Sequence, residues 1–176
     1  DGMKNEIING VTDWVYEEEF AFVKAFEWSP NGDKIAYLKF DESEVQEFSM
    51  DLYGRYGRDL YPTQDVFKYP KAGEDNAKVS LHLFDFASGN NSKIELGEYE
   101  YLPRLNWTQD ENLFSVQSLN RYQNELKLHL VDVNSKTPKL ILTEKDNAYV
   151  DVTNDLTFLN NNSFIWTSEK DGWKHI

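Results

Sequence analysis

The chain has 176 residues, of which 40% are hydrophobic and 15% aromatic, and this composition favours one folded domain over a disordered chain. Its formal net charge of −13 opposes binding to nucleic-acid phosphate or to an anionic membrane surface. The absence of cysteine excludes disulfides, iron–sulfur clusters, Cys-ligated zinc and thiol catalysis, and no stretch approaches the roughly 20 apolar residues that span a bilayer.

An acidic run lies near the N-terminus, in Asp13-Trp14-Val15-Tyr16-Glu17-Glu18-Glu19-Phe20. Its aromatic neighbours suggest carboxylates held against apolar walls, with Trp14 and Tyr16 packed inward, where a charge-assisted hydrogen bond is stronger than in water. Adjacent side chains on a helical turn diverge by about 100°, so two of the carboxylates, but not all three, can converge on one ammonium group. The spacing alone also fits an ordinary helix start, capped by Thr12 or Asp13, in which the dipole favours acids.

Alternation of apolar and polar residues predicts half-buried strands at 34–40, 79–86 and 126–133. Polar turn sequences separate these strands. They lie at 31–33, 88–91, 108–112 and 160–162.

A weak internal repeat underlies this pattern. An apolar residue, a polar turn and an apolar strand follow one another at 26–36, 105–115 and 157–166. Polar hairpins follow the second and third copies, which is the order of strands in a β-propeller blade. Repeats this degenerate also occur in β-sandwiches, so the pattern alone predicts an all-β fold and leaves both architectures open.

A long insertion, from about residue 41 to 78, interrupts the first repeat. Insertions of this length in compact domains are usually functional. Residues 50–62 are rich in Tyr, Arg and Gly, a mixture that suits a protein interface. A surface hairpin without a partner is the alternative.

The sequence offers no catalytic or metal-binding motif. His82, His129 and His175 are scattered without metal-ligand spacing, so we expect structural or exposed roles for them and neither a metal nor another cofactor. No Gly-x-Ser-x-Gly nucleophile elbow occurs, so the chain could not by itself perform acyl transfer. Arg121, in a polar hairpin, is expected to pair with nearby groups.

Four pieces of the chain resemble the dipeptidyl peptidase IV family. Residues 9–19 resemble the double-glutamate segment of that family, and 69–73 and, weakly, 172–176 extend the likeness. Residues 28–37 also match, although this turn is common to many propeller proteins. The resemblance implies the N-terminal β-propeller portion of a bacterial member: residues 1–176 form part of a propeller of four-stranded antiparallel blades, about two complete with partial flanks.

The same resemblance implies a short helical turn near residues 12–20 and an insertion arm at about 41–78. We expect the chain to be an internal fragment, since it starts at Asp1 without an initiator Met. The catalytic α/β-hydrolase domain of the family is absent from it.

The resemblance also implies a function. In the family, two adjacent glutamates grip the free N-terminal amine of a peptide, and Glu18 and Glu19 occupy this motif here. Tyr149 lies near where the family places an aromatic wall for the second substrate residue. The intact protein would be a serine exopeptidase that releases Xaa-Pro or Xaa-Ala dipeptides, its Ser/Asp/His triad lying on the missing domain. An arginine that contacts the substrate carbonyl would lie upstream of Asp1, and Arg121 is a weak substitute.

Partners implied by the resemblance are peptides with a free N-terminus, the chain's own C-terminal hydrolase domain, and a second copy bound through the arm at 45–68. The expected location is the periplasm or the cell surface. The main rival is a non-catalytic β-propeller that binds peptides or proteins, and a weaker one is a sugar-binding all-β domain.

Overall fold

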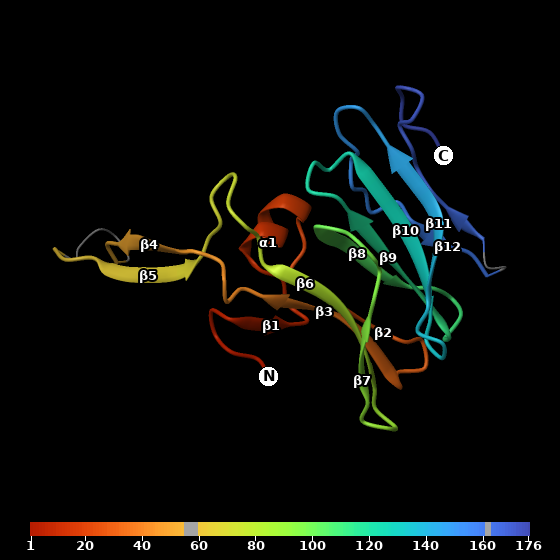
Figure 1. Ribbon diagram of the computed structural model, residues 1–176, viewed down its shortest axis with the longest axis horizontal. Helices are drawn as coiled ribbons and strands as arrows, with labels where there is room; N and C mark the ends of the chain where they lie inside the picture. The colour runs from red at the N-terminus through yellow and green to blue at the C-terminus, as the bar shows by residue number, and fades with distance from the viewer. Residues whose placement is uncertain (55–59, 161–162) are drawn as a thin grey trace.

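The computed structural model describes residues 1–54, 60–160 and 163–176, and its chain forms strands and one short helix (Figure 1). The helix is α1 (Trp14–Phe20). The strands are β1 (Ile7–Asn9), β2 (Phe26–Trp28), β3 (Lys34–Asp41), β4 (Glu47–Leu52), β5 (Thr63–Lys68), β6 (Lys78–Asp85), β7 (Asn91–Ile94), β8 (Tyr101–Trp107), β9 (Leu113–Leu119), β10 (Glu125–Asp132), β11 (Pro138–Lys145), β12 (Thr157–Phe158) and β13 (Phe164–Ile165).

Two antiparallel sheets form the body of the chain. In the first, β1 and β2 pair with the same edge of β3, followed by β6 and β7, so five strands fill four positions. The second sheet is a meander in the order β8-β9-β10-β11. A separate two-stranded sheet, β12-β13, follows it in the chain. The expected all-β fold of four-stranded antiparallel sheets is therefore confirmed. The predicted turn at 160–162 lies partly outside the described residues, since 161 and 162 are not among them.

β1 and β2 lie end to end beside β3 and together form the outer strand of the first sheet. The chain leaves the sheet after β1, forms α1, and returns to the sheet at β2. The amide of Gly10 donates to the carbonyl of Leu38 at 2.9 Å, and the amide of Leu38 donates to the carbonyl of Ala25, also at 2.9 Å. The amide of Ala25 donates to the carbonyl of Gly10 at 3.0 Å and closes the base of the excursion. Gly10 has φ +73°, a conformation that L side chains rarely adopt, so the backbone favours glycine there.

The aromatic face of α1 packs into the core between the two sheets. Tyr16 is 2% exposed, its ring meets that of Phe40 edge-on at 4.8 Å between centroids, and its hydroxyl accepts a hydrogen bond from the Leu102 amide at 2.7 Å. Phe20 lies one turn later and is also buried, because residues four apart share a helix face. The helix is thus tied to β3 and to β8, one strand from each sheet.

The insertion forms a hairpin, β4-β5, that projects away from both sheets at the left of Figure 1. At its base, the ring of Trp14 contacts that of Tyr69 with 4.1 Å between centroids, and Lys68 Nζ donates to the Val45 carbonyl at 2.8 Å. Trp14 therefore packs against the arm, whereas the sequence suggested that it packs inward with Tyr16. Residues 55–59, within the Tyr-, Arg- and Gly-rich stretch, lie outside the described residues.

Candidate functional site

Helix α1 is short and sharply bounded. Asp13 has extended backbone and its Oδ1 accepts from the Tyr16 amide at 3.0 Å, so it is the N-cap. Thr12, the other capping candidate, instead donates its hydroxyl to the Phe22 carbonyl at 2.9 Å. The helix ends where Ala21 adopts a left-handed conformation with φ +55°. The helix is therefore limited to the seven residues between these two ends.

The three glutamates of α1 face solvent. Because Tyr16 and Phe20 occupy the buried face, Glu17, Glu18 and Glu19 lie between them on the exposed side. The described residues of this chain therefore do not enclose these carboxylates in the apolar walls that the sequence suggested. Among the described residues, Glu18 makes no hydrogen bond or ion pair, so both of its carboxylate oxygens are open.

Of the three glutamates, Glu19 is the one whose side chain has a partner among the described residues. Its Oε1 accepts from Gln123 Nε2 at 2.7 Å. Gln123 lies 104 residues away, in the turn between β9 and β10. The contact joins the helix that leaves the first sheet to the hairpin of the second.

Tyr149 lies in the connection between β11 and β12 and is 56% exposed. Its hydroxyl donates to Asp151 Oδ1 at 3.1 Å. This hydrogen bond raises the pKa of Tyr149, and the charges of Glu19 and Glu169 contribute to the rise. Gln123, which binds Glu19, also accepts a hydrogen bond from the Val150 amide at 2.8 Å, so Glu19 and the residue next to Tyr149 share one partner.

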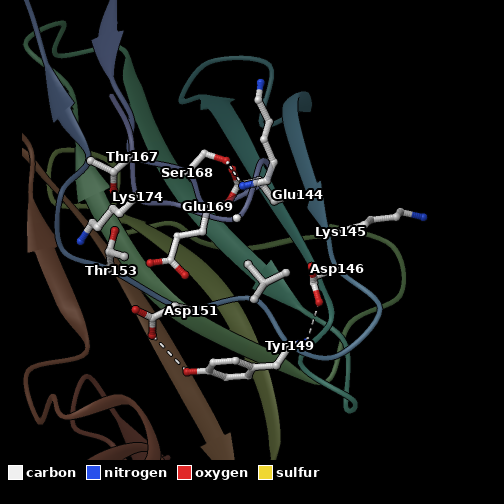
Figure 2. Close-up of a pocket in the computed structure, with 13 residues that line it drawn as sticks. Glu144, Lys145, Asp146, Tyr149, Asp151, Thr153, Thr167, Ser168, Glu169 and Lys174 are labelled. Atoms are coloured by element: carbon white, nitrogen blue, oxygen red, sulfur yellow. Dashed lines mark hydrogen bonds between the residues drawn. The ribbon is translucent and has the colours of Figure 1, made fainter.

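A cavity of ≈ 270 Å³ lies beside Tyr149, between the end of β11 and the turn that follows β13. In Figure 2 the carboxylates of Asp151 and Glu169 lie on the same side of the cavity as the Tyr149 hydroxyl, whereas Lys145 points away. Lys174, also in the lining, forms an ion pair with Asp155 at 2.6 Å. Lys170 also lines the cavity, but the carboxylates of Asp151 and Glu169 near Tyr149 suit a cationic or hydrogen-bond-donating group.

Arg104, on β8, makes a second link between α1 and the segment after Tyr149. Its Nη1 donates to the Phe20 carbonyl at 3.0 Å and its Nε donates to Asn154 Oδ1 at 2.7 Å. Its guanidinium also lies 5.6 Å from the centroid of the Phe22 ring. Arg104 was not among the residues predicted from the sequence, although a single cation between the apolar residues of 101–107 was a usable signal.

Two buried carboxyl groups lie beneath α1, at the base of the arm. Asp13 is 6% exposed, and burial raises its pKa to about 6 against the opposing effect of its hydrogen bond from Tyr16. Glu42 is 7% exposed, and burial together with the charge of Asp13 raises its pKa to about 7, while Lys68 opposes the rise. No sequence signal pointed to this pair, because the two residues meet only through the tertiary fold.

Arg121 and two histidines have structural partners. Arg121 pairs with Glu100 at 2.9 Å and donates to the Glu74 carbonyl at 2.6 Å, which confirms the expectation that it pairs with nearby groups. His82 and His129 each lie 3.0 Å from a serine hydroxyl, and burial lowers the pKa of both. In the described part of the chain, no cluster of three His, Asp or Glu residues could hold a metal.

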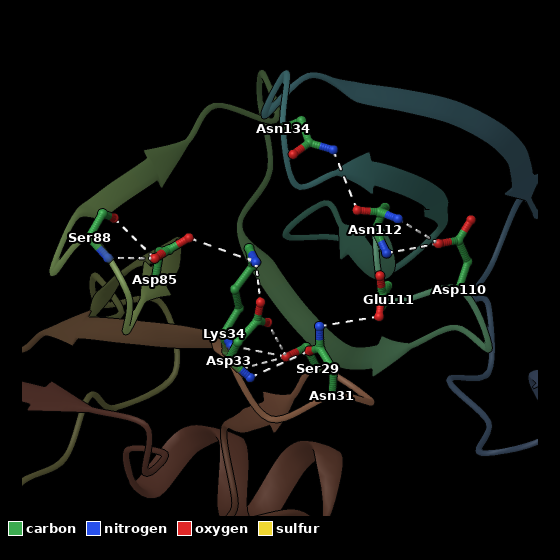
Figure 3. A network of polar contacts seen from close by, with 10 residues as sticks. All are labelled: Ser29, Asn31, Asp33, Lys34, Asp85, Ser88, Asp110, Glu111, Asn112 and Asn134. Carbon is green, nitrogen blue, oxygen red and sulfur yellow. Dashed lines mark hydrogen bonds and ion pairs between the residues drawn. The ribbon is translucent and has the colours of Figure 1, made fainter.

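A second polar cluster lies at the other end of β8, in the turns β2–β3 and β8–β9 (Figure 3). Ser29 binds the Lys34 carbonyl through its amide and hydroxyl, at 3.0 and 3.2 Å, and Thr108 binds the Leu113 carbonyl in the same way, at 3.1 and 2.9 Å. The two turns are thus equivalent positions of one repeat. Asn31 Nδ2 joins them by donating to Glu111 Oε2 at 3.2 Å. The hydrogen bonds of this cluster hold the two turns in place.

No helix in the described ranges combines the length and hydropathy of a membrane span. The seven residues of α1 are far fewer than a bilayer requires.

Comparison with known proteins gives one consistent result. Residues 1–176 match the family model described as "Dipeptidyl peptidase IV (DPP IV) N-terminal region". The crystal structure of Porphyromonas gingivalis dipeptidyl peptidase 4 is similar with a TM-score of 0.92 and 41% identity, over 99% of this chain and 25% of that one.

Two curated sequences are also similar. Dipeptidyl aminopeptidase B of Saccharomyces cerevisiae is 32% identical over 160 residues, which cover 87% of this chain and 19% of that protein. Venom dipeptidyl peptidase 4 of Vespa velutina is 35% identical over 164 residues, or 88% of this chain and 21% of that protein. The chain therefore spans about a fifth to a quarter of the length of the relatives it matches. Since the family model matches residues 1–176 and the similar structure covers 99% of the chain, the chain belongs to the dipeptidyl peptidase IV family and corresponds to its N-terminal region.

Proposed function

We propose that this chain is the substrate-recognition portion of a serine exopeptidase that releases N-terminal dipeptides, Xaa-Pro or Xaa-Ala, from peptides. In this proposal Glu18 and Glu19 bind the ammonium group of the substrate. A C-terminal α/β-hydrolase domain supplies the Ser, Asp and His that cleave the bond. One observation carries the proposal: α1, between β1 and β2, presents two adjacent carboxylates with open oxygens.

The open oxygens match the donors of an ammonium group. A primary ammonium has three N–H donors, Glu18 offers two free oxygens among the described residues, and Glu19 retains Oε2. Anchoring the amine at a fixed point places the second peptide bond of the substrate at the nucleophile. Binding therefore contributes through orientation and selects dipeptide release over internal cleavage.

The exposure of the carboxylates in this chain defines what the rest of the protein must provide. An ion pair between exposed groups is worth only about 0–1 kcal/mol, because water and salt screen it. The same pair gains strength once the hydrolase domain and the bound peptide exclude water from it. Strong amine binding is thus proposed to require both domains.

The test uses the protein that carries both domains. Glu18→Gln and Glu19→Gln should lower kcat/KM for a chromogenic Xaa-Pro amide by roughly 30-fold or more, the loss expected when one member of a desolvated charge pair is removed. Glu17→Gln is the matched control, since Glu17 is exposed on the same helix but lies apart from the proposed pair. An N-acetylated substrate should be cleaved poorly by the parent protein.

Equal kinetics for the three variants, or normal cleavage of the acetylated substrate, would contradict the amine anchor. A parent protein that binds peptides but cleaves none would instead be a non-catalytic binding module.

We also propose that the β4–β5 arm contacts a second copy of the protein. Phe48, Met50 and Leu52 alternate along β4 and therefore share one face of the hairpin, with each side chain more than one-third exposed. Phe48 and Met50 also line a groove of ≈ 590 Å³ that reaches Trp14 and Tyr69. Removing residues 45–68 should convert a dimer into a monomer by light scattering, and an unchanged mass would count against the arm.

The proposed location, the periplasm or the cell surface, follows from the use of such peptidases on external peptides. Fractionation of the source cells with an antibody against the chain would test it. Recovery in the cytosolic fraction alone would exclude it.

A further inference from the structure

Gln123 is held in an unusual conformation at the tip of the β9–β10 hairpin. Its φ is +54°, in the left-handed region that non-glycine residues rarely adopt. The turn around it is tightly bonded: its amide donates to the Asn120 carbonyl at 3.0 Å, and the Asn120 side chain accepts from the amides of Asn124 and Glu125, both at 3.0 Å. A conformation that costs free energy and is fixed this firmly is common at functional sites.

From this position Gln123 contacts both elements of the proposed substrate site. Its side-chain Nε2 donates to Glu19 Oε1 at 2.7 Å, and its carbonyl accepts from the Val150 amide at 2.8 Å. Val150 follows Tyr149 directly, so the second bond holds the backbone that carries the tyrosine. A single residue of the second sheet thus spans the distance between the helix and the segment at 149–151.

The chemistry of an amide suits this position. A glutamine donor fixes the orientation of a carboxylate without cancelling its charge, whereas a lysine or an arginine would neutralise it. With Oε1 occupied, Oε2 of Glu19 stays open for a cationic ligand. The amide therefore orients the carboxylate and leaves its affinity for an ammonium intact.

We propose that Gln123 is a positioning residue of the amine site. It holds the Glu19 carboxylate in one orientation and keeps it at a fixed distance from Tyr149, so that a bound dipeptide meets its amine anchor and its aromatic wall together. This inference rests on the function proposed above, in which Glu19 binds the substrate amine.

The test compares variants at two left-handed positions of one sheet, in the protein that carries both domains. Gln123→Gly removes the side chain and suits the backbone conformation. Lys136→Gly makes the same change in the β10–β11 turn, at the end of β10 away from Gln123. Lys136 is exposed there and has φ +57°. For an Xaa-Pro amide, Gln123→Gly should raise KM by roughly 3- to 10-fold with kcat within twofold, as for loss of one charge-assisted hydrogen bond, and Lys136→Gly should change neither.

A third variant tests the neutrality of the amide. Gln123→Lys places an ammonium where it can pair with Glu19 and compete with the substrate, so its KM should exceed that of Gln123→Gly. Equal KM values for the lysine and glycine variants would overturn the argument from charge. If the glycine variant fails to fold, Gln123→Asn replaces it, because Asn tolerates a positive φ and its amide is one methylene shorter.

A double-mutant cycle separates this inference from the function on which it rests. In a Glu19→Gln background, Gln123→Gly should produce no further rise in KM, because the charge that it orients is gone. An undiminished effect in that background would show that Gln123 acts elsewhere and overturn the inference. If Glu19→Gln alone leaves KM unchanged, the proposed amine anchor itself is wrong, whatever Gln123 does.

Discussion

Glu42 offers a direct test of the electrostatics beneath α1, through the substitution Glu42→Gln. Glu42 is 7% exposed, and its pKa rises from 4.5 to about 7, chiefly because burial disfavours the charged form. The neighbouring charge of Asp13 adds to the rise and that of Lys68 opposes it. Glutamine resembles the protonated acid in shape and stays neutral at every pH, so the variant removes the charge with little change in packing.

The direction of the effect follows from the direction of the pKa change. A folded state with the higher pKa binds more protons than the unfolded state, so the free energy of unfolding falls as pH rises from 4.5 through 7. A rise of this size corresponds to about 3 kcal/mol. Because Asp13 titrates in the same range and shares the effect, we expect about 1–3 kcal/mol for Glu42 alone.

The assay is urea unfolding of the protein that carries this chain, followed by tryptophan fluorescence between pH 5 and pH 8. Parent and Glu42→Gln should have similar stability at pH 5, and the variant should be the more stable at pH 8. Glu44→Gln, in the same turn but exposed, is the control and should follow the parent at every pH. Parallel curves for parent and Glu42→Gln would refute the reasoning, because they would show that Glu42 is equally solvated in both states.

Three further substitutions test the contacts that hold α1. Tyr16→Phe leaves the buried Leu102 amide without its acceptor and should lower the free energy of unfolding by about 1–3 kcal/mol, measured in urea. Gly10→Ala should cost about 1–2 kcal/mol because of the positive φ of Gly10, and Gly32→Ala, at nearly the same φ, should cost a similar amount. Arg104→Met keeps the apolar stem but removes the hydrogen bonds to Phe20 and Asn154, so amides at the C-terminal end of α1 should exchange hydrogen faster, while those of β10 should not.

Local pattern was enough to locate the main strands. The strands predicted at 34–40, 79–86 and 126–133 occur as β3, β6 and β10, each within one residue at either end. The reason is physical: each strand has a buried and a less buried face, so its residues alternate with a period of two. The repeat was also visible, because Ser29 and Thr108 occupy equivalent turn positions and need a hydroxyl there.

The site was predicted only as far as its residues are close in sequence. The acidic run was evident, but the amide that orients Glu19 lies 104 residues away and its identity depends on how two sheets pack. Trp14 was misplaced for the same reason, because its partner Tyr69 reaches it only after the arm has folded back. Arg104 and the pair of Asp13 with Glu42 likewise depend on tertiary contacts that periodicity does not encode.

The hydrogen bonds that close the chain between Gly10 and Ala25 have an evolutionary consequence. Pairing along β3 continues from Asn9 opposite Lys39 to Phe26 opposite Tyr37, as though the intervening residues were absent. The strand register therefore does not depend on the length of that excursion, and the entropic cost of lengthening a closed loop rises only slowly. Selection could therefore change the exposed residues of the segment, charges included, while the buried Tyr16 and Phe20 keep it packed in the core, and a new ligand preference could arise on an unaltered scaffold.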